Sequence, residues 1–115
     1  EEASQHLRSA HYMVFEANYD ESMLSTGSYP ADLKRRIRSN TGHLSNNQTG
    51  EFLAENYQDH LEAVFLCHLS KENNHPDVAF TTVKSYLEKK NIRVGKDLKL
   101  IILERFAPTE LYVFE

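Results

Sequence analysis

Short apolar runs separated by polar residues predict the strands of this chain. The runs cover residues 12–15, 61–67, 98–103 and 111–114. The run at 61–67 is almost continuously apolar, which is typical of a strand covered on both faces. The last two runs are joined by a plausible turn at 107–109, so we expect them to pair antiparallel.

Helical spacing and capping signals predict four helices. They cover residues 3–10, 31–38, a segment that begins near Ser45, and 76 to about 90. Pro30 and Pro76 suit first-turn positions, and Ser45 with Gln48 fits the capping-box pattern. Residues 24–30 are expected to form a loop. The alternation of helices and strands argues for an α/β layered fold.

Composition limits the class of protein. The chain has 115 residues, 40% hydrophobic and 26% charged, which fits one ordinary globular domain over 1–115. No apolar run approaches the roughly 20 residues that cross a bilayer, and the amino terminus does not resemble a secretory signal. The single cysteine, Cys67, indicates a reducing compartment. These features together predict a cytoplasmic protein without a membrane partner.

Polar residues with metal-binding or acid–base chemistry stand where elements end or begin. Glu16 ends the first strand with Asp20 close behind, and His68 is expected as the last residue of the central strand. His43 precedes a helix amino terminus, a position that favours a bound anion such as phosphate, although an ordinary loop histidine is the alternative. A carboxylate and imidazoles brought together suit zinc or manganese.

Other signals are weaker. The chain contains no H-x-H, H-E-x-x-H or C-x-x-C spacing, so it holds no self-contained metal motif. His75, directly before Pro76, is expected to cap that helix or face solvent. The basic helix 31–38 carries Lys34, Arg35, Arg36 and Arg38, which suit either a nucleic-acid backbone or a solvated helix face.

Three strings carry a family resemblance. They are VFEANYD at 14–20, YPADLKRRIRSNTGHLSN at 29–46 and FLCHLSKENNHP at 65–76. With them the chain resembles the carboxy-terminal half of a metallo-β-lactamase-fold hydrolase, closest to the bacterial YycJ/VicX type and more distantly ribonuclease Z. Tyr19 stands where the closest relatives of that type carry a histidine.

The resemblance implies roles for four residues. In the superfamily a strand-end acid bridges two metal ions, which implies Glu16 or Asp20 here. A histidine before a helix contacts the scissile phosphate, which implies His43. A final strand-end histidine binds metal, which implies His68. The implied cofactor is a pair of divalent ions, zinc or manganese, in the intact protein.

The family's H-x-H-x-D-H signature, which supplies most metal ligands, is absent from these residues. The resemblance therefore implies half of an αββα sandwich, a mixed sheet with covering helices, whose partner is the missing amino-terminal half. The chain alone is expected to be inactive. Its unpartnered apolar sheet face would invite homo-oligomerisation.

The favoured function is part of a metal-dependent hydrolase, a phosphodiesterase or nuclease acting through metal-activated hydroxide on nucleic acid or a small phosphodiester. A non-catalytic α/β interaction module is the alternative, with the histidines as ordinary loop residues. A self-sufficient small enzyme is the least supported, because the chain lacks a complete catalytic set.

Overall fold

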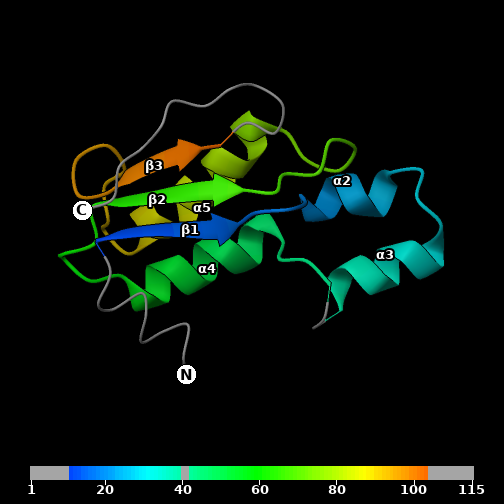
Figure 1. Cartoon of the computed structure of the whole chain (residues 1–115), viewed down its shortest axis with the longest axis horizontal. Coiled ribbons are helices and arrows are strands. Elements are labelled where there is room, and N and C mark those ends of the chain that lie inside the picture. Colours follow the sequence, from blue (N-terminus) through cyan, green and yellow to red (C-terminus); the bar gives the residue numbers. More distant parts are fainter. Residues whose placement is uncertain (1–10, 40–41, 104–115) are drawn as a thin grey trace.

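The computed structural model describes residues 11–39 and 42–103 (Figure 1). In chain order the elements are β1 (Tyr12–Glu16), α2 (Glu21–Thr26), α3 (Ala31–Arg38), α4 (Asn46–Asn56), β2 (Ala63–Cys67), α5 (Pro76–Lys89) and β3 (Lys99–Ile102). Among the helices in this part of the chain, none is both long and apolar enough to cross a membrane.

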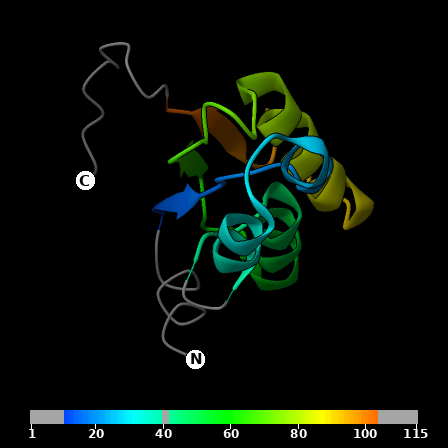
Figure 2. The same ribbon diagram turned by 90° about the vertical axis from the view of Figure 1, so that its right-hand side faces the viewer.

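The three described strands form a parallel sheet in the order β1-β2-β3. Because the order advances in one direction and such crossovers are right-handed, both connections must return on the same side of the sheet. Figure 2 shows this arrangement, with α4 and α5 together on one face. On the other face Val14 is 51% exposed. Because the three described strands are parallel, their carboxyl ends all lie along one edge of the sheet, which we call the carboxyl edge.

The core lies between the sheet and the helix pair. Its fully buried members include Val64 and Leu66 from β2, Leu53 from α4 and Val83 from α5. Gly50 lets the two helices approach closely, because a Cβ atom there would lie 2.8 Å from the Tyr86 ring. The helix pair is therefore fixed against the sheet by apolar packing.

The predicted α/β class and most elements are confirmed. The strands at 12–15, 61–67 and 98–103 appear as β1, β2 and β3, with ends shifted by one or two residues. The basic helix, the Ser45 capping box and the helix after His75 are also present. The helix expected at 3–10, the turn at 107–109 and the strand at 111–114 lie outside the described residues.

The prediction of a loop over 24–30 was wrong in its first half, because α2 extends to Thr26. Asp20 is the helix N-cap, and its carboxylate accepts a hydrogen bond from the Met23 N–H at 3.1 Å. Only Leu24 of this helix is buried. Its two apolar residues, Met23 and Leu24, are adjacent and give no readable helical periodicity, so the helix depends on its cap and its neighbours.

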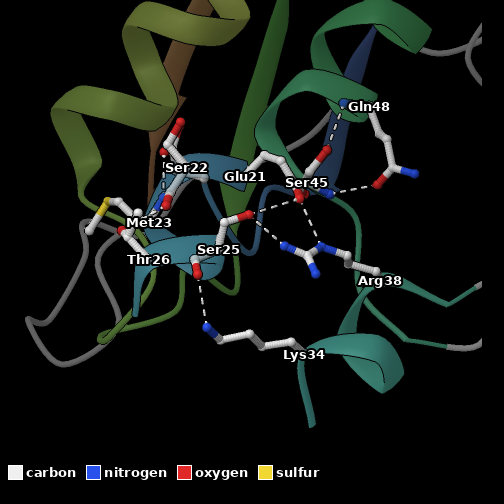
Figure 3. A network of polar contacts seen from close by, with 10 residues as sticks. Glu21, Ser22, Met23, Ser25, Thr26, Lys34, Arg38, Ser45 and Gln48 are labelled. Carbon is white, nitrogen blue, oxygen red and sulfur yellow. Dashed lines mark hydrogen bonds and ion pairs between the residues drawn. The ribbon is translucent and has the colours of Figure 1, made fainter. Parts of the chain in front are cut away.

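Together α2 and α3 form a helical arm, residues 21–38, which lies beyond the carboxyl ends of the strands (Figure 1). None of its residues belongs to the hydrophobic core cluster. Polar contacts join the two helices instead (Figure 3). The Lys34 ammonium donates to the Ser25 and Gly27 carbonyls at 2.9 and 2.8 Å. The Arg38 guanidinium donates to Glu21 at 2.8 Å and to the Ser25 hydroxyl at 2.7 Å.

Replacing Lys34 with Met should loosen the arm, because the carbonyls at the end of α2 lose a charged donor. We expect a local loss of about 1 kcal/mol, measured as faster amide hydrogen exchange in α2 with unchanged exchange in α5. Arg36→Gln on the same helix is the matched control and should leave α2 protected. Equal exchange in both variants would contradict the role given to Lys34.

Candidate active site

Three segments converge at the carboxyl edge of the sheet: the exits of β1 and β2, and the start of α4. Asn18, just after β1, joins the other two. Its backbone N–H donates to the Leu44 carbonyl at 2.9 Å, and its carbonyl accepts from the Ser70 N–H at 2.7 Å. Its side chain donates to the His68 carbonyl at 2.6 Å. The segments that carry the predicted site residues are therefore hydrogen-bonded to one another.

A buried pair of amides supports this junction. Asn46 and Asn74 are 0% and 5% exposed. Each side chain donates to the other's carbonyl oxygen at 2.9 Å. Asn74 also donates to the Ala17 carbonyl at 3.0 Å and accepts from the His75 N–H at 2.9 Å. The pair thus connects the exit of β1 and the first turns of α4 and α5.

Glu16 and His43 are in direct contact. The Nδ1 atom of His43 lies 2.8 Å from Oε2 of Glu16, while the other carboxylate oxygen accepts from the Leu44 N–H at 2.9 Å. The side chains are 47% exposed for His43 and 21% for Glu16. Because an ionised carboxylate only accepts hydrogen bonds, this contact assigns the proton to Nδ1 and leaves Nε2 for a ligand.

His68 lies one residue beyond the end of β2, not on the strand as predicted. Its φ is 58°, a left-handed conformation that a histidine rarely adopts and that ends the strand ladder. Its Nδ1 atom is 3.5 Å from Glu16 Oε2, and its side chain is 75% exposed. Glu16 therefore lies beside both histidines, and the His68 imidazole extends into solvent.

Asp20 lies apart from this group, as the N-cap of α2. Tyr19 beside it is 2% exposed, and its backbone forms a bridge with Ser45. Burial raises the pKa of the Tyr19 hydroxyl, and the charge of Glu21 adds to the rise. The structure therefore places Tyr19 in a buried junction between β1 and α4.

The donor set of one carboxylate and two imidazoles suits a borderline divalent ion in chemical type. Its arrangement is not that of a complete site. Within residues 11–39 and 42–103, no group of three or more His, Cys, Asp or Glu side chains could hold a metal ion. Both Glu16 oxygens already accept hydrogen bonds from the protein. By themselves, the described residues therefore do not form a metal site.

Several residues of the junction were missed from the sequence. Asn18, Asn46 and Asn74 carry no catalytic motif, and Thr49 donates to the Glu16 carbonyl from inside α4. A usable sequence signal was their spacing, because Asn46 and Thr49 share a helix face with Leu53, and polar residues on a buried face need partners. The expectation for His75 is confirmed, because it caps α5 by accepting from the Asp77 N–H at 3.1 Å.

Comparison with known proteins identifies bacterial relatives. The chain is 34% identical over 105 residues to exodeoxyribonuclease YycJ of Bacillus anthracis, covering 91% of the chain and 40% of that protein. It is 39% identical over 87 residues to exodeoxyribonuclease WalJ of Streptococcus pneumoniae, covering 76% of the chain and 32% of that protein. No protein-family model matches the chain. No solved structure matches it either.

The chain is thus a homologue of the YycJ/WalJ proteins over most of its own length, and the predicted resemblance is confirmed. It spans 40% or less of the length of these curated relatives.

Breaking the amide pair should destabilise the fold. Asn74→Ala leaves Asn46, the Ala17 carbonyl and the His75 N–H without a buried partner, at a cost of about 2 to 4 kcal/mol. Urea unfolding measures it. Asn46→Ala should have a similar effect, and the double variant should lose less than the sum. Asn47→Ala, at the neighbouring exposed position, is the control. Strict additivity of the two substitutions would contradict the proposed coupling.

Cys67 reports on the charge of Glu16, its partner in the β1–β2 register. Burial raises the pKa of the Cys67 thiol, and the Glu16 charge adds to the rise. The folded thiol should therefore stay protonated to higher pH than a free cysteine. Glu16→Gln should lower that pKa and speed reaction with an aromatic disulfide reagent at neutral pH. Glu62→Gln is the matched control and should leave the rate unchanged.

Proposed function

We propose that this relative of the YycJ/WalJ exodeoxyribonucleases forms part of a metal-dependent phosphodiesterase that acts on nucleic acid. The observation that carries the proposal is the contact of His43 with Glu16 at the sheet edge where His68 also lies. The names of the relatives supply the reaction class, a nuclease-type hydrolase. The intact protein would contribute the remaining ligands from residues outside this chain.

In this proposal His43 faces the scissile phosphate. Glu16 accepts from Nδ1 and holds the ring, so Nε2 can donate to a phosphate oxygen or protonate the leaving oxygen when the ring is charged. Ser45, the N-cap of α4, lies two residues after His43, so the positive end of the helix dipole is near the same anion. His43 would therefore offer a proton on Nε2 and lie where a phosphate group can bind.

The geometry favours a positioning role for Glu16 over a metal-bridging one. Both of its oxygens are used, by the His43 imidazole and the Leu44 N–H. Asp20 is used as a helix cap, so its assignment as a metal ligand has no geometric support. We therefore propose Glu16 as the acid of this half of the site. Substituting Glu16 and Asp20 separately tests which carboxylate is needed for turnover.

His68 is proposed as the metal ligand of this chain. Its left-handed backbone and exposed ring direct a donor outward from the sheet edge. Bound zinc or manganese ions, two in the intact protein, would lower the pKa of a bound water and stabilise developing negative charge. Because the described residues do not complete such a site, the chain alone is proposed to be inactive.

One exposed sheet position supports a missing half. Helices α4 and α5 cover one sheet face, whereas on the other face Val14 is half exposed, although its register partner Phe65 is buried. An αββα sandwich would cover that face with the sheet of the other half of the domain. In its absence a second copy of the chain would be the next candidate partner.

One observation favours the alternative of a non-catalytic interaction module. Both Glu16 oxygens already accept hydrogen bonds from the protein, and no group of three or more His, Cys, Asp or Glu side chains among the described residues could hold a metal ion. The following experiment distinguishes the two functions.

In the intact protein that contains this chain, His43→Ala and Glu16→Gln should each lower phosphodiester turnover by about 10²- to 10⁴-fold. The two effects should not multiply in the double variant, because the residues act as a unit. His68→Ala should lower the bound metal measured by elemental analysis. Asp20→Asn preserves a good helix cap and is the control.

Loss of turnover in Asp20→Asn with normal turnover in Glu16→Gln would reverse the assignment of the acid. Unchanged metal content and turnover in His68→Ala would favour the interaction module. Metal-dependent turnover by these 115 residues alone would refute the proposed inactivity.

A further inference from the structure

The basic residues of α3 separate into two pairs with different surroundings. Lys34 and Arg38 lie four residues apart, on one face of the helix, and both bind α2. Arg35 and Arg36 follow Lys34 by about 100° and 200° around the helix axis. Both are exposed. Two of the four cations, Lys34 and Arg38, therefore bind α2, and the other two, Arg35 and Arg36, are exposed to solvent.

The outward pair is available for a ligand. Arg35 has one ion-pair partner, Asp32 at 3.4 Å, and the side chains are 73% and 90% exposed. Such an exposed pair contributes little and is easily exchanged for another anion. Among the described residues, the Arg36 guanidinium has no hydrogen-bond or ion-pair partner. Two arginines can thus bind an external anion without breaking a contact that stabilises the arm.

The arm is fixed in place next to His43. The His43 N–H donates to the Ile37 carbonyl at 2.9 Å. Gly42 packs so tightly on the last turn of α3 that a Cβ atom would collide with the Arg36 and Ile37 carbonyls. The carboxyl end of α3 and His43 are therefore adjacent, so the last turn of the helix, which includes Arg35 and Arg36, lies beside the candidate site.

We propose that Arg35 and Arg36 bind backbone phosphates of the DNA strand whose scissile phosphate lies at His43. The inference rests on the proposed function and adds a polymer-binding surface to it. Successive phosphates of one strand are about 3.4 Å apart along a duplex axis, so a strand held at His43 brings further phosphates to the arm. Arginine suits them through its paired donors.

The overall negative charge of the chain would limit DNA binding to the exposed basic residues of α3. The formal net charge of these 115 residues is -4, so the chain as a whole repels a polyanion. A strand would bind where local positive charge is exposed, beside the site. Contacts with phosphates carry no base information, so the arm would hold DNA without reading its sequence. A small phosphodiester ends at the site and does not reach α3.

The test compares two substrates of the intact protein. Arg35→Gln combined with Arg36→Gln should raise KM for DNA by about tenfold and leave hydrolysis of a small chromogenic phosphodiester unchanged. Fluorescence anisotropy with a labelled DNA oligonucleotide should show weaker binding, and the slope of log affinity against log salt should fall by roughly 1 for each lost contact.

The matched control is Lys90→Gln combined with Lys96→Gln, which removes the same charge at exposed positions outside the arm. DNA affinity and salt slope equal to this control would overturn the proposal, as would an absence of DNA binding by the unmodified protein. Weaker DNA binding in the arm variant supports the proposal even if neither substrate is hydrolysed, an outcome that would refute the proposed function alone.

Discussion

The reciprocal hydrogen bonds of Asn46 and Asn74 are the contact on which the candidate site depends. Two buried amides satisfy each other, and Asn74 also binds the Ala17 carbonyl and the His75 N–H. Buried polar groups of this kind are costly when unpaired, so the arrangement is stable only when all the segments are in place. Glu16, His43 and His68 are carried by chain segments directly adjoining this junction.

The sheet and its helices could be predicted because their signals are local and strong. The run at 61–67 reads as a buried strand, and Pro76 with Asp77 marks the start of α5. Helix α2 could not be predicted in the same way, since Leu24 is its single buried residue. The position of α2 depends on the cap at Asp20 and on hydrogen bonds from Lys34, which lies eight residues after Thr26, the last residue of the helix.

The members of the candidate site could be selected from the sequence, but their contacts could not. Glu16, His43 and His68 stand out in the sequence as chemically capable residues at element ends. The sequence left both Glu16 and Asp20 as candidates, because Glu16 ends the first strand and Asp20 follows it closely. Their difference comes from tertiary neighbours: Glu16 meets an imidazole from 27 residues away, whereas Asp20 binds the N–H three residues ahead. Only the folded chain distinguishes a long-range partner from a local cap.

The helical arm lies outside the hydrophobic core cluster, and polar contacts join its two helices. Leu24 is the only buried residue of the two arm helices, so the core and the amide junction would tolerate changes in the surface charge of the arm. Related proteins could therefore differ in the surface charge of this arm while the sheet edge that carries Glu16 and His43 keeps its structure.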